Sequence, residues 1–287
     1  MQKGSNLPYY LMLFWATVIW GGTFTAVKYV VMDFPPLVGA SLRFIITFLF
    51  LFPILLKREG IKALPSRYDL PSLTLMGLTG IFLYNMFFFY GMKTAAATDG
   101  ALVVALSPVV TALLSTLLLK ERFNLRQAVG FLLCFTGVST IIAKGSWVVI
   151  TTWAVNKGEL LLFGCATSFA VYSVAGKWAM ARVSPMTSTT FATGLGALML
   201  TLVALPDYAQ ASLTQISLPA VLGLLYLAIL GSGVAFLFWF FGVNRLGAGK
   251  ASAFYNFVPV WSAVIAIIAL GDYFEKHPKT YLHQKFF

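Results

Sequence analysis

Nine long apolar runs restrict this chain to a lipid environment. Each is close to the roughly 20 residues that an α-helix needs to cross a hydrocarbon core, and a helix satisfies its own backbone hydrogen bonds there. Only 10% of the 287 residues are charged, whereas a soluble domain carries about a quarter. The sequence therefore predicts an all-α integral membrane protein and excludes a soluble globular enzyme. The runs cover residues 9–31, 36–56, 71–92, 99–119, 125–143, 158–180, 186–206, 217–243 and 250–270.

The lysines and arginines are divided unequally between the two sides of the membrane. When successive loops alternate in side, one side receives twelve bases and the other only Lys28, Lys93, Lys144 and Lys157. The positive-inside rule then places the N-terminus in the cytoplasm and explains the net charge of +11 without a nucleic-acid partner. We expect a multi-pass protein of the cell inner membrane. The twelve bases are Lys3, Lys57, Arg58, Lys62, Arg67, Lys120, Arg122, Arg126, Lys177, Arg182, Arg245 and Lys250.

Two parts of the sequence match each other and indicate an internal repeat. Residues 91–123 align without a gap on residues 242–274, at an offset of 151, with seven identities. At an offset of 149, Lys28 falls on Lys177, so the first span matches the sixth. The repeat unit therefore contains five spans.

An odd number of spans turns the second copy upside down, and the loop charges agree with this. The loop after span two holds four bases, whereas its counterpart, residues 207–217, holds none. Two inverted halves around a site near the midplane are the architecture of a secondary transporter. We assign residues 1–144 to the first repeat, 145–272 to the second and 273–287 to an atypical polar tail.

Several segments also resemble one known family. They are "WATVIWGGTFTAVK", "PPLVGASLRF", "SPVVTALLSTLLLKERFNLRQAVGFLLCFTGV" and "NFVPVWSAVIAIIALGD". These segments resemble the EamA-like permeases of the drug/metabolite transporter superfamily, over about residues 10–272. The resemblance implies ten spans, both termini in the cytoplasm, and export of amino acids, metabolites or toxic organic compounds.

The two ends of the sequence carry separate expectations. A tenth helix should follow Asp272, yet the remaining residues are polar and aromatic, so we expect a ten-span fold with the tenth span missing or altered. The nine-span order places Lys276, Lys279 and Lys285 outside, against the charge rule. The first apolar run exceeds signal-peptide length and ends without a small-residue cleavage site, so we expect it to be retained.

Motifs for hydrolytic, metal-dependent or nucleotide-driven chemistry are absent from the sequence, which has no GxSxG, no HExxH and no phosphate loop. We therefore expect neither an enzyme nor a cofactor. His277 and His283 form a lone pair in a polar tail, which is a weak metal signal, so no metal site is expected. Cys134 and Cys165 lie within apolar runs and are interpreted as packing residues.

Arg43 is the one charge deep inside an apolar run. It lies about eight residues into span two, or roughly 12 Å deep, where an unpaired charge costs at least about 2.5 kcal/mol. It must face protein, water or a substrate carboxylate. Two interpretations stay open: a structural arginine bonded to helix carbonyls, and a cavity residue that binds substrate.

Spans three and eight are rich in aromatic residues. Rings with a few polar tips suit a small amphipathic solute, and buried amide or phenol groups need partners. The alternative, that these rings face lipid or simply pack, stays open. The candidate substrate-binding residues are Trp20, Arg43, Tyr84, Asn85, Phe88, Tyr172, Trp239, Tyr255 and Asn256.

Two prolines and one carboxylate occur at matching places in the two halves. Pro108 and Pro259 lie mid-span, where a proline permits a kink, so they are candidate hinges; a static bend is the alternative. Glu121, matched by Asp272, is interpreted as a structural residue near a helix start. Gly21 and Gly22 are expected to let a neighbouring helix approach closely.

These observations favour a secondary transporter that exports small amphipathic metabolites, with amino acids first by resemblance. Two alternatives are efflux of aromatic or cationic drugs and a non-transporting membrane sensor. The expected partners are a small-molecule substrate and the lipid bilayer, with a homodimer left open.

Overall fold

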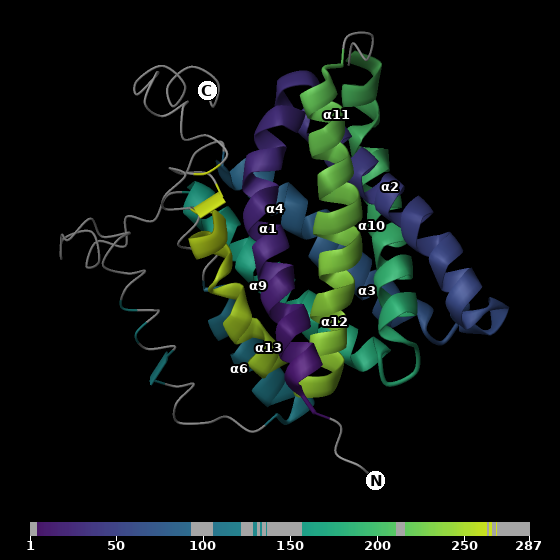
Figure 1. Ribbon diagram of the computed structural model, residues 1–287, viewed down its shortest axis with the longest axis vertical. Coiled ribbons are helices and arrows are strands. Elements are labelled where there is room, and N and C mark those ends of the chain that lie inside the picture. The colour runs from purple at the N-terminus through teal and green to yellow at the C-terminus, as the bar shows by residue number, and fades with distance from the viewer. Residues whose placement is uncertain are drawn as a thin grey trace.

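The computed structural model describes residues 5–92, 106–121, 157–210 and 216–262, and the isolated positions 129, 130, 133, 136, 264, 265 and 268. Within these residues the chain is helical and contains no strand, which confirms the predicted all-α class for this part of the chain. The elements are α1 (Leu7–Asp33), α2 (Pro36–Glu59), η1 (Ile61–Ala63), α3 (Leu70–Met76), η2 (Gly77–Leu83), α4 (Tyr84–Met92), α6 (Ser107–Leu119), α9 (Lys157–Ala179), α10 (Pro185–Gln210), α11 (Leu218–Leu225), η3 (Tyr226–Val234), α12 (Ala235–Leu246) and α13 (Ala248–Tyr255) (Figure 1).

Six helical segments of the described chain are long and apolar enough to cross a membrane. They coincide with the expected spans one, two, three, six, seven and eight. The 13-residue α6 is the described part of span four. Most of the expected fifth span, including Cys134, lies outside the described residues. The start of the fourth span and the tail with His277 and His283 lie outside them as well.

Prolines mark the start of most described helices. A proline in the first turn loses nothing, because the N–H groups of that turn have no acceptor within the helix. Pro108 is one of these, since α6 begins at Ser107, so it starts a helix where the sequence predicted a mid-span kink. The prolines in first turns are Pro8, Pro36, Pro71, Pro108, Pro185 and Pro219.

The expected ninth span is interrupted. α13 ends at Tyr255, residues 256–257 form a turn, and the chain becomes helical again over 258–262. Pro259 is the second residue of this new segment, and it cannot supply the N–H that a continuous helix would direct at the carbonyl of Tyr255. Pro259 therefore separates two helices instead of bending one.

Spans three and eight each contain a π-helical stretch, η2 and η3, which the sequence did not predict. A π-helix changes which backbone groups are paired and often occurs at functional sites. In η3, the carbonyl of Gly231 accepts a hydrogen bond from the Trp20 indole at 2.9 Å, and the carbonyl of Ala228 accepts one from Thr47 Oγ1 at 2.9 Å. Carbonyl groups of η3 thus accept hydrogen bonds from side chains of α1 and α2.

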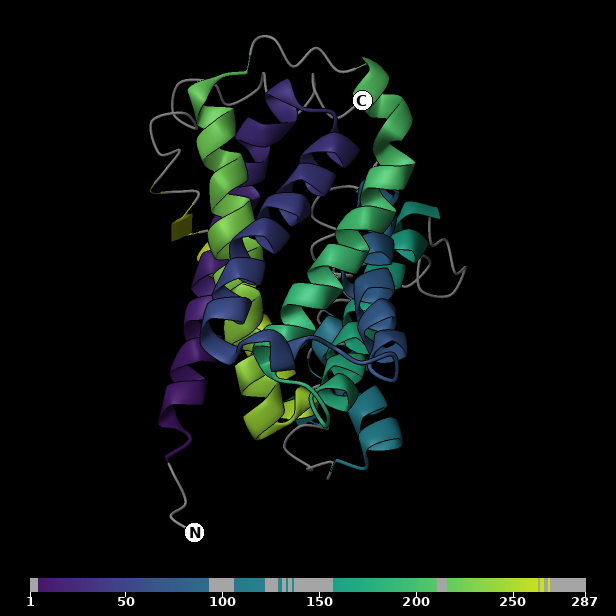
Figure 2. The same cartoon turned by 90° about the vertical axis from the view of Figure 1, so that its right-hand side faces the viewer.

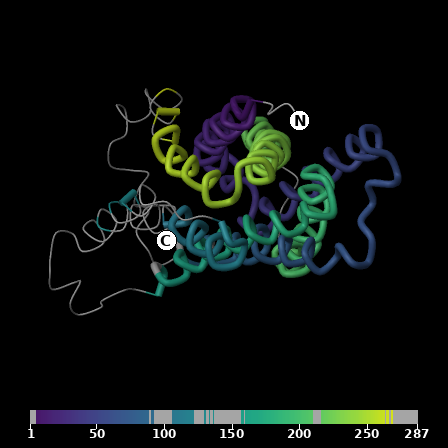
Figure 3. Tube along the Cα trace, turned by 90° about the horizontal axis from the view of Figure 1, so that it is seen from below, coloured from purple at the N-terminus to yellow at the C-terminus, as the bar shows by residue number. Residues whose placement is uncertain are grey.

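The helices form two groups that face each other (Figure 3). In the first group α1 packs along α11, η3 and α12, with α2 against η3 and α13 against α12. In the second group α9 packs along α3, η2 and α4, with α10 against η2 and α6 against α9. The two groups are joined most extensively by α2 with α10 (Figure 2) and by α6 with α13, and α12 also contacts α9 and α10.

Close helix contacts depend on small residues. A Cβ added to Gly21 would lie 2.5 Å from the Cβ of Trp261 and 2.8 Å from its backbone carbon. A Cβ on Gly22 would collide with the Tyr226 hydroxyl, which donates to the carbonyl of Ile19 at 2.9 Å. The prediction that this glycine pair permits close approach is confirmed.

Glu121 joins the end of α6 to the start of α13. Its two carboxylate oxygens accept hydrogen bonds from the backbone N–H groups of Ala248 at 2.9 Å and Gly249 at 3.0 Å. These are N–H groups of the first helical turn, which have no acceptor inside the helix. The structural role assigned to Glu121 from the sequence is confirmed.

Candidate functional site

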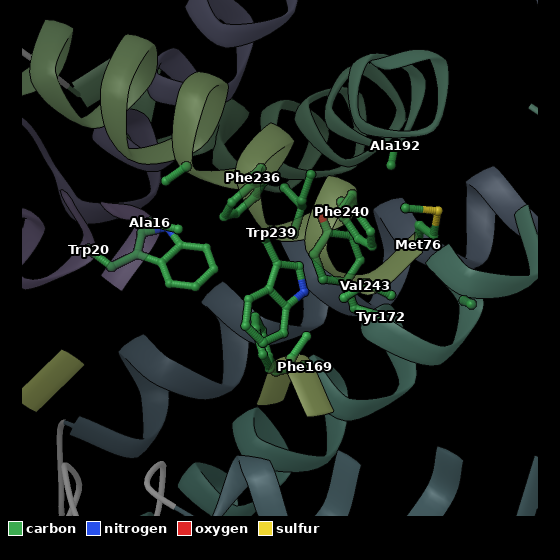
Figure 4. Packing of buried hydrophobic residues seen from close by; sticks show 14 of the residues in the cluster. Ala16, Trp20, Met76, Phe169, Tyr172, Ala192, Phe236, Trp239, Phe240 and Val243 are labelled. Carbon is green, nitrogen blue, oxygen red and sulfur yellow. The ribbon is translucent and has the colours of Figure 1, made fainter. Parts of the chain in front are cut away.

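Six aromatic side chains from four helices meet in the middle of the described helices. We call them the aromatic cluster: Trp20 of α1, Phe169 and Tyr172 of α9, Phe236 and Trp239 of α12, and Tyr255 of α13. Figure 4 shows Trp239 between Trp20 and Tyr172, with Phe169 beside it. The cluster therefore lies where the two helix groups face each other.

Phe169 is the hub of the aromatic cluster. Its ring centroid lies 4.6 Å from that of Tyr255, 5.3 Å from Trp239 and 6.2 Å from Trp20. The centroids of Trp20 and Trp239 are 5.5 Å apart. Most of these pairs are tilted or edge-on, the arrangement that the ring quadrupoles favour.

Tyr84 and Phe88 of α4 extend the aromatic cluster. The two rings stack with centroids 6.4 Å apart and an interplanar angle of 4°. The Tyr84 hydroxyl lies 3.5 Å from the Tyr255 hydroxyl, which is a long hydrogen bond between the two phenols. The structure thus brings together six predicted site residues: Trp20, Tyr84, Phe88, Tyr172, Trp239 and Tyr255.

Two polar groups in the aromatic cluster are buried without a hydrogen-bond partner among the described residues. They are the Tyr172 hydroxyl and the Trp239 indole N–H. The two residues are 1% and 0% exposed, so water does not reach them in this conformation. An unsatisfied buried group costs about 1–3 kcal/mol, and such a group in a native site calls for an explanation.

Arg43 of α2 points toward this region. Its Nε donates to Ser232 Oγ of η3 at 2.6 Å, and its guanidinium lies 4.9 Å from the centroid of the Phe44 ring. The Tyr84 and Tyr255 hydroxyls lie within electrostatic reach. The structural interpretation expected Arg43 to bond to helix carbonyls. Among the described residues it instead bonds to a serine side chain.

The two predicted asparagines lie apart from the aromatic cluster. Asn85 is buried, and its Nδ2 donates to the carbonyl of Ile81, one turn earlier, at 2.6 Å. Asn256 is exposed in the turn that follows α13. Neither forms a contact with a cluster ring among the described interactions.

Two hollows lie elsewhere in the described part of the molecule. One, of about 410 Å³, lies between α2 and α10, and the other, of about 450 Å³, lies between α1, α11 and η3. Neither is lined by a residue of the aromatic cluster. In this conformation the cluster side chains pack against one another.

Serine–carboxylate contacts occur at both ends of the molecule, and we call them the end clasps. At the end where α1 stops, Ser217 donates to Asp33 Oδ2 from its backbone N–H at 2.8 Å and from its hydroxyl at 2.6 Å. At the opposite end, Ser66 donates to Asp69 Oδ2 at the same two distances, 2.8 and 2.6 Å. Arg182, which follows α9, completes the second clasp with an ion pair of 2.7 Å to Asp69. The Ser66 hydroxyl bond, followed by the Arg182 bond, lowers the pKa of Asp69 to about 2.

Metal-binding side chains do not gather anywhere in the described residues. Cys165 is free and buried, and its thiol lies 3.4 Å from the carbonyl of Tyr84. It packs against Leu162, Tyr84 and Phe88, as predicted for a packing residue.

A model of one protein family matches the chain twice, over residues 7–143 and 156–278, and its description is "EamA-like transporter family". The chain belongs to this family. A solved crystal structure has a similar fold, with a TM-score of 0.74 and 24% sequence identity, and the match covers 92% of this chain and 89% of that one. The protein is thus a multi-pass membrane protein of a transporter family.

Several relatives of this EamA-like protein are named as transporters. The uncharacterized transporter YyaM of Bacillus subtilis is 33% identical, over 91% of this chain and 86% of its own length. An uncharacterized transporter of Archaeoglobus fulgidus is 28% identical, over 92% and 90%. A probable terminal-alkyne amino-acid exporter of Streptantibioticus cattleyicolor is 28% identical, over 90% and 85%.

Sequence reasoning missed three residues of this EamA-like site. Phe169 is the position that matches Trp20 at the offset of 149, so the repeat itself pointed to it. Phe236 likewise matches Asn85 at the offset of 151. Ser232 gave no signal, because a serine in an apolar helix is unremarkable until the fold brings it to Arg43.

Proposed function

We propose that this EamA-like protein is a secondary transporter that exports small amphipathic metabolites, amino acids first among them, by alternating access. The observation that carries the proposal is the aromatic cluster, which holds two unsatisfied polar groups where two helix groups meet. A site of rings with a few polar tips suits a small amphipathic solute. In this conformation the rings of the cluster pack against one another.

The packing of the helices supports an inverted repeat. Under the five-span repeat, spans one and eight exchange with spans six and three. The structure contains both pairs, α1 with α12 and α9 with α4, and also the pairs α2 with α10 and α6 with α13, each of which exchanges with itself. A two-fold axis in the membrane plane requires this pattern.

Irregular features also recur in the repeat register. Shifted by 151, residues 77–83 of η2 fall on residues 228–234, inside η3. With the same shift Ser66 falls on Ser217, so the serines of the two end clasps occupy equivalent places at opposite ends. We propose that the halves rock about the aromatic cluster, with hinges where helices restart at Pro108 and Pro259.

The export of amino acids rests on one relative and on the chemistry of the site. That relative is named a probable terminal-alkyne amino-acid exporter, and an amino acid combines polar and apolar parts. The loop charges favour the inner membrane with the N-terminus in the cytoplasm.

Efflux from proteoliposomes tests the proposed function. The purified full chain, reconstituted with radiolabelled amino acids inside, is expected to release them faster than protein-free vesicles do. Trp20→Phe removes the bond to Gly231 and should slow release, whereas Trp15→Phe, on the exposed side of the same helix, should not. Transport of quaternary amines but not of amino acids would favour drug efflux, and no transport by a correctly inserted chain would favour a sensor.

A further inference from the structure

Arg43 is a partly buried cation that has no anionic partner among the described residues. Its Nε donates to Ser232, and no carboxylate pairs with it among the described residues. The ion pair present in that part of the chain, Arg182 with Asp69, lies at the end of the helices. The two terminal guanidinium nitrogens, which form the fork that suits a carboxylate, are therefore available for a ligand.

The repeat indicates that the fold itself does not need an arginine and a serine at these two positions. At the offset of 149 Arg43 falls on Ala192, and at the offset of 151 Ile81 falls on Ser232. Ala192 and Ile81 are both fully buried in the same hydrophobic core. The equivalent place in the second helix group is thus filled by apolar residues, so Arg43 and Ser232 make one side of the site polar.

The polar side continues into the aromatic cluster, where two polar groups have no hydrogen-bond partner among the described residues. The Tyr172 hydroxyl and the Trp239 N–H are unsatisfied in the aromatic cluster, and the Tyr84 and Tyr255 hydroxyls lie within electrostatic reach of Arg43. A ligand that places an anion at the guanidinium and an apolar body among the rings would satisfy both sides. Orphaned polar groups and an unpaired cation thus point to one ligand.

We propose that the terminal nitrogens of Arg43, held in place by Ser232, bind a substrate carboxylate, and that the aromatic cluster holds the apolar body. The ligand class is a monocarboxylic acid with an aromatic or branched apolar body. An α-ammonium group is not required, because no Asp or Glu lies at the depth of Arg43 in the described spans to receive it. The inference rests on the proposed function and narrows the substrate class to compounds that carry a carboxylate.

A competition assay with four matched compounds tests this assignment. Vesicles containing the full chain take up radiolabelled 3-phenylpropionate, and phenylalanine, 3-phenylpropanamide and 2-phenylethylamine compete with it. We expect phenylalanine to compete with an affinity similar to that of 3-phenylpropionate. The neutral amide and the cationic amine should compete at least about tenfold more weakly, the loss typical of a missing charge-assisted hydrogen bond.

Three variants connect the selectivity to Arg43. Arg43→Gln should weaken acid binding by about tenfold or more and leave competition by the amide unchanged, which a purely structural role would not do. Arg43→Lys keeps the charge but loses the planar fork, so its affinity for acids should be intermediate. Arg58→Gln removes a charge from the exposed end of the same helix and should leave both affinities unchanged.

The results separate failure of this inference from failure of the proposed function. Equal transport of the acid, the amide and the amine, or undiminished acid affinity in Arg43→Gln, would overturn the carboxylate assignment and leave the transporter standing. Transport of none of these compounds and of no amino acid would overturn both. If Arg43→Gln does not insert, Arg43→Lys decides, and acid affinity equal to that of the unmodified chain overturns the assignment.

Discussion

At the scale of single residues, the aromatic cluster is unusual in its hydrogen bonding. The Trp20 indole N–H donates a hydrogen bond to the carbonyl of Gly231. The Trp239 indole N–H and the Tyr172 hydroxyl have no hydrogen-bond partner among the described residues. A core built only for stability would place apolar groups at such positions, because a well-packed isostere avoids the cost of an unmade bond. The unsatisfied groups are therefore informative about function.

Removing the Tyr172 hydroxyl should separate stability from function. Tyr172→Phe is expected to leave the substrate-free Tm in detergent unchanged or to raise it, because an unsatisfied group that costs about 1–3 kcal/mol disappears. The same variant should bind its solute more weakly. The matched control is Tyr208→Phe, which loses the 2.7 Å bond to Ser41 and should lower the Tm. Equal destabilisation by both variants would contradict a ligand-binding role for Tyr172.

Two further positions were chosen from the sequence and stay predictions. Asn85→Ala and Tyr255→Ala should each lower transport without lowering abundance in the membrane. Tyr255 would lose its place beside Tyr84 and Phe169, and Asn85 would lose its bond to Ile81 at the end of η2. Initial transport rates, normalised to membrane abundance by quantitative blotting, provide the measurement. A variant that transports at the normal rate identifies a residue outside the path.

At the scale of elements, the end clasps hold the start of one helix to the end of another. Asp69 and Ser66 lie just before α3, and Arg182 just after α9, so their contact fixes the ends of two helices that pack side by side. Asp33 and Ser217 do the same for α1 and α11 at the opposite end. Each clasp joins two helices of the same group, so it can stay intact while the two groups move relative to each other.

The pKa of Asp69 gives the second clasp a defined pH dependence. Its folded value of about 2 is below the unfolded value of about 3.9, so its stabilisation is complete above about pH 4 and is lost as the pH falls through about 2. Asp69→Asn should lower the Tm in detergent by a few degrees near neutral pH, and the difference from the unmodified chain should shrink at about pH 3. Asp207→Asn, a similar change at the end of α10, is the control. A difference that grows with acidity would show that Asp69 is not stabilised as a carboxylate.

At the scale of the whole molecule, the described loops between long helices lie at one of the two ends of the helices. Residues of η1 lie at the same end as the start of α1, and the start of α11 lies at the other end (Figure 1). Ile61 and Leu218 are 78% and 68% exposed, so both are accessible to a reagent. These two positions report the orientation of the protein.

Labelling with a membrane-impermeant maleimide tests the orientation. In a background without Cys134 and Cys165, Leu218→Cys should react in intact cells, and Ile61→Cys should react only after the cytoplasmic side is opened. This expectation follows from the positive charge of the loops on the Ile61 side. Reversed labelling would overturn the cytoplasmic N-terminus, and labelling of both from one side would contradict an odd number of crossings between them.

The sequence alone determined the class, the family and most of the spans. Lipid forces each span to satisfy its own backbone, so length and hydropathy mark helices locally, and prolines mark where they begin. The repeat and the loop charges indicated the inverted arrangement, because both can be read directly from the sequence. Six of the nine candidate site residues lie together in one region of the structure, and their role in binding stays a prediction.

Only the tertiary structure decided which side chains meet. The bond from Trp20 to Gly231 joins residues 211 apart in sequence, and the bond from Arg43 to Ser232 joins residues 189 apart. No local pattern specifies such contacts, since they depend on how whole helices pack and on the π-helical stretches that reorient a backbone carbonyl or a serine. The role of Phe169 as hub, the partner of Arg43 and the unsatisfied groups of Tyr172 and Trp239 all follow from that packing.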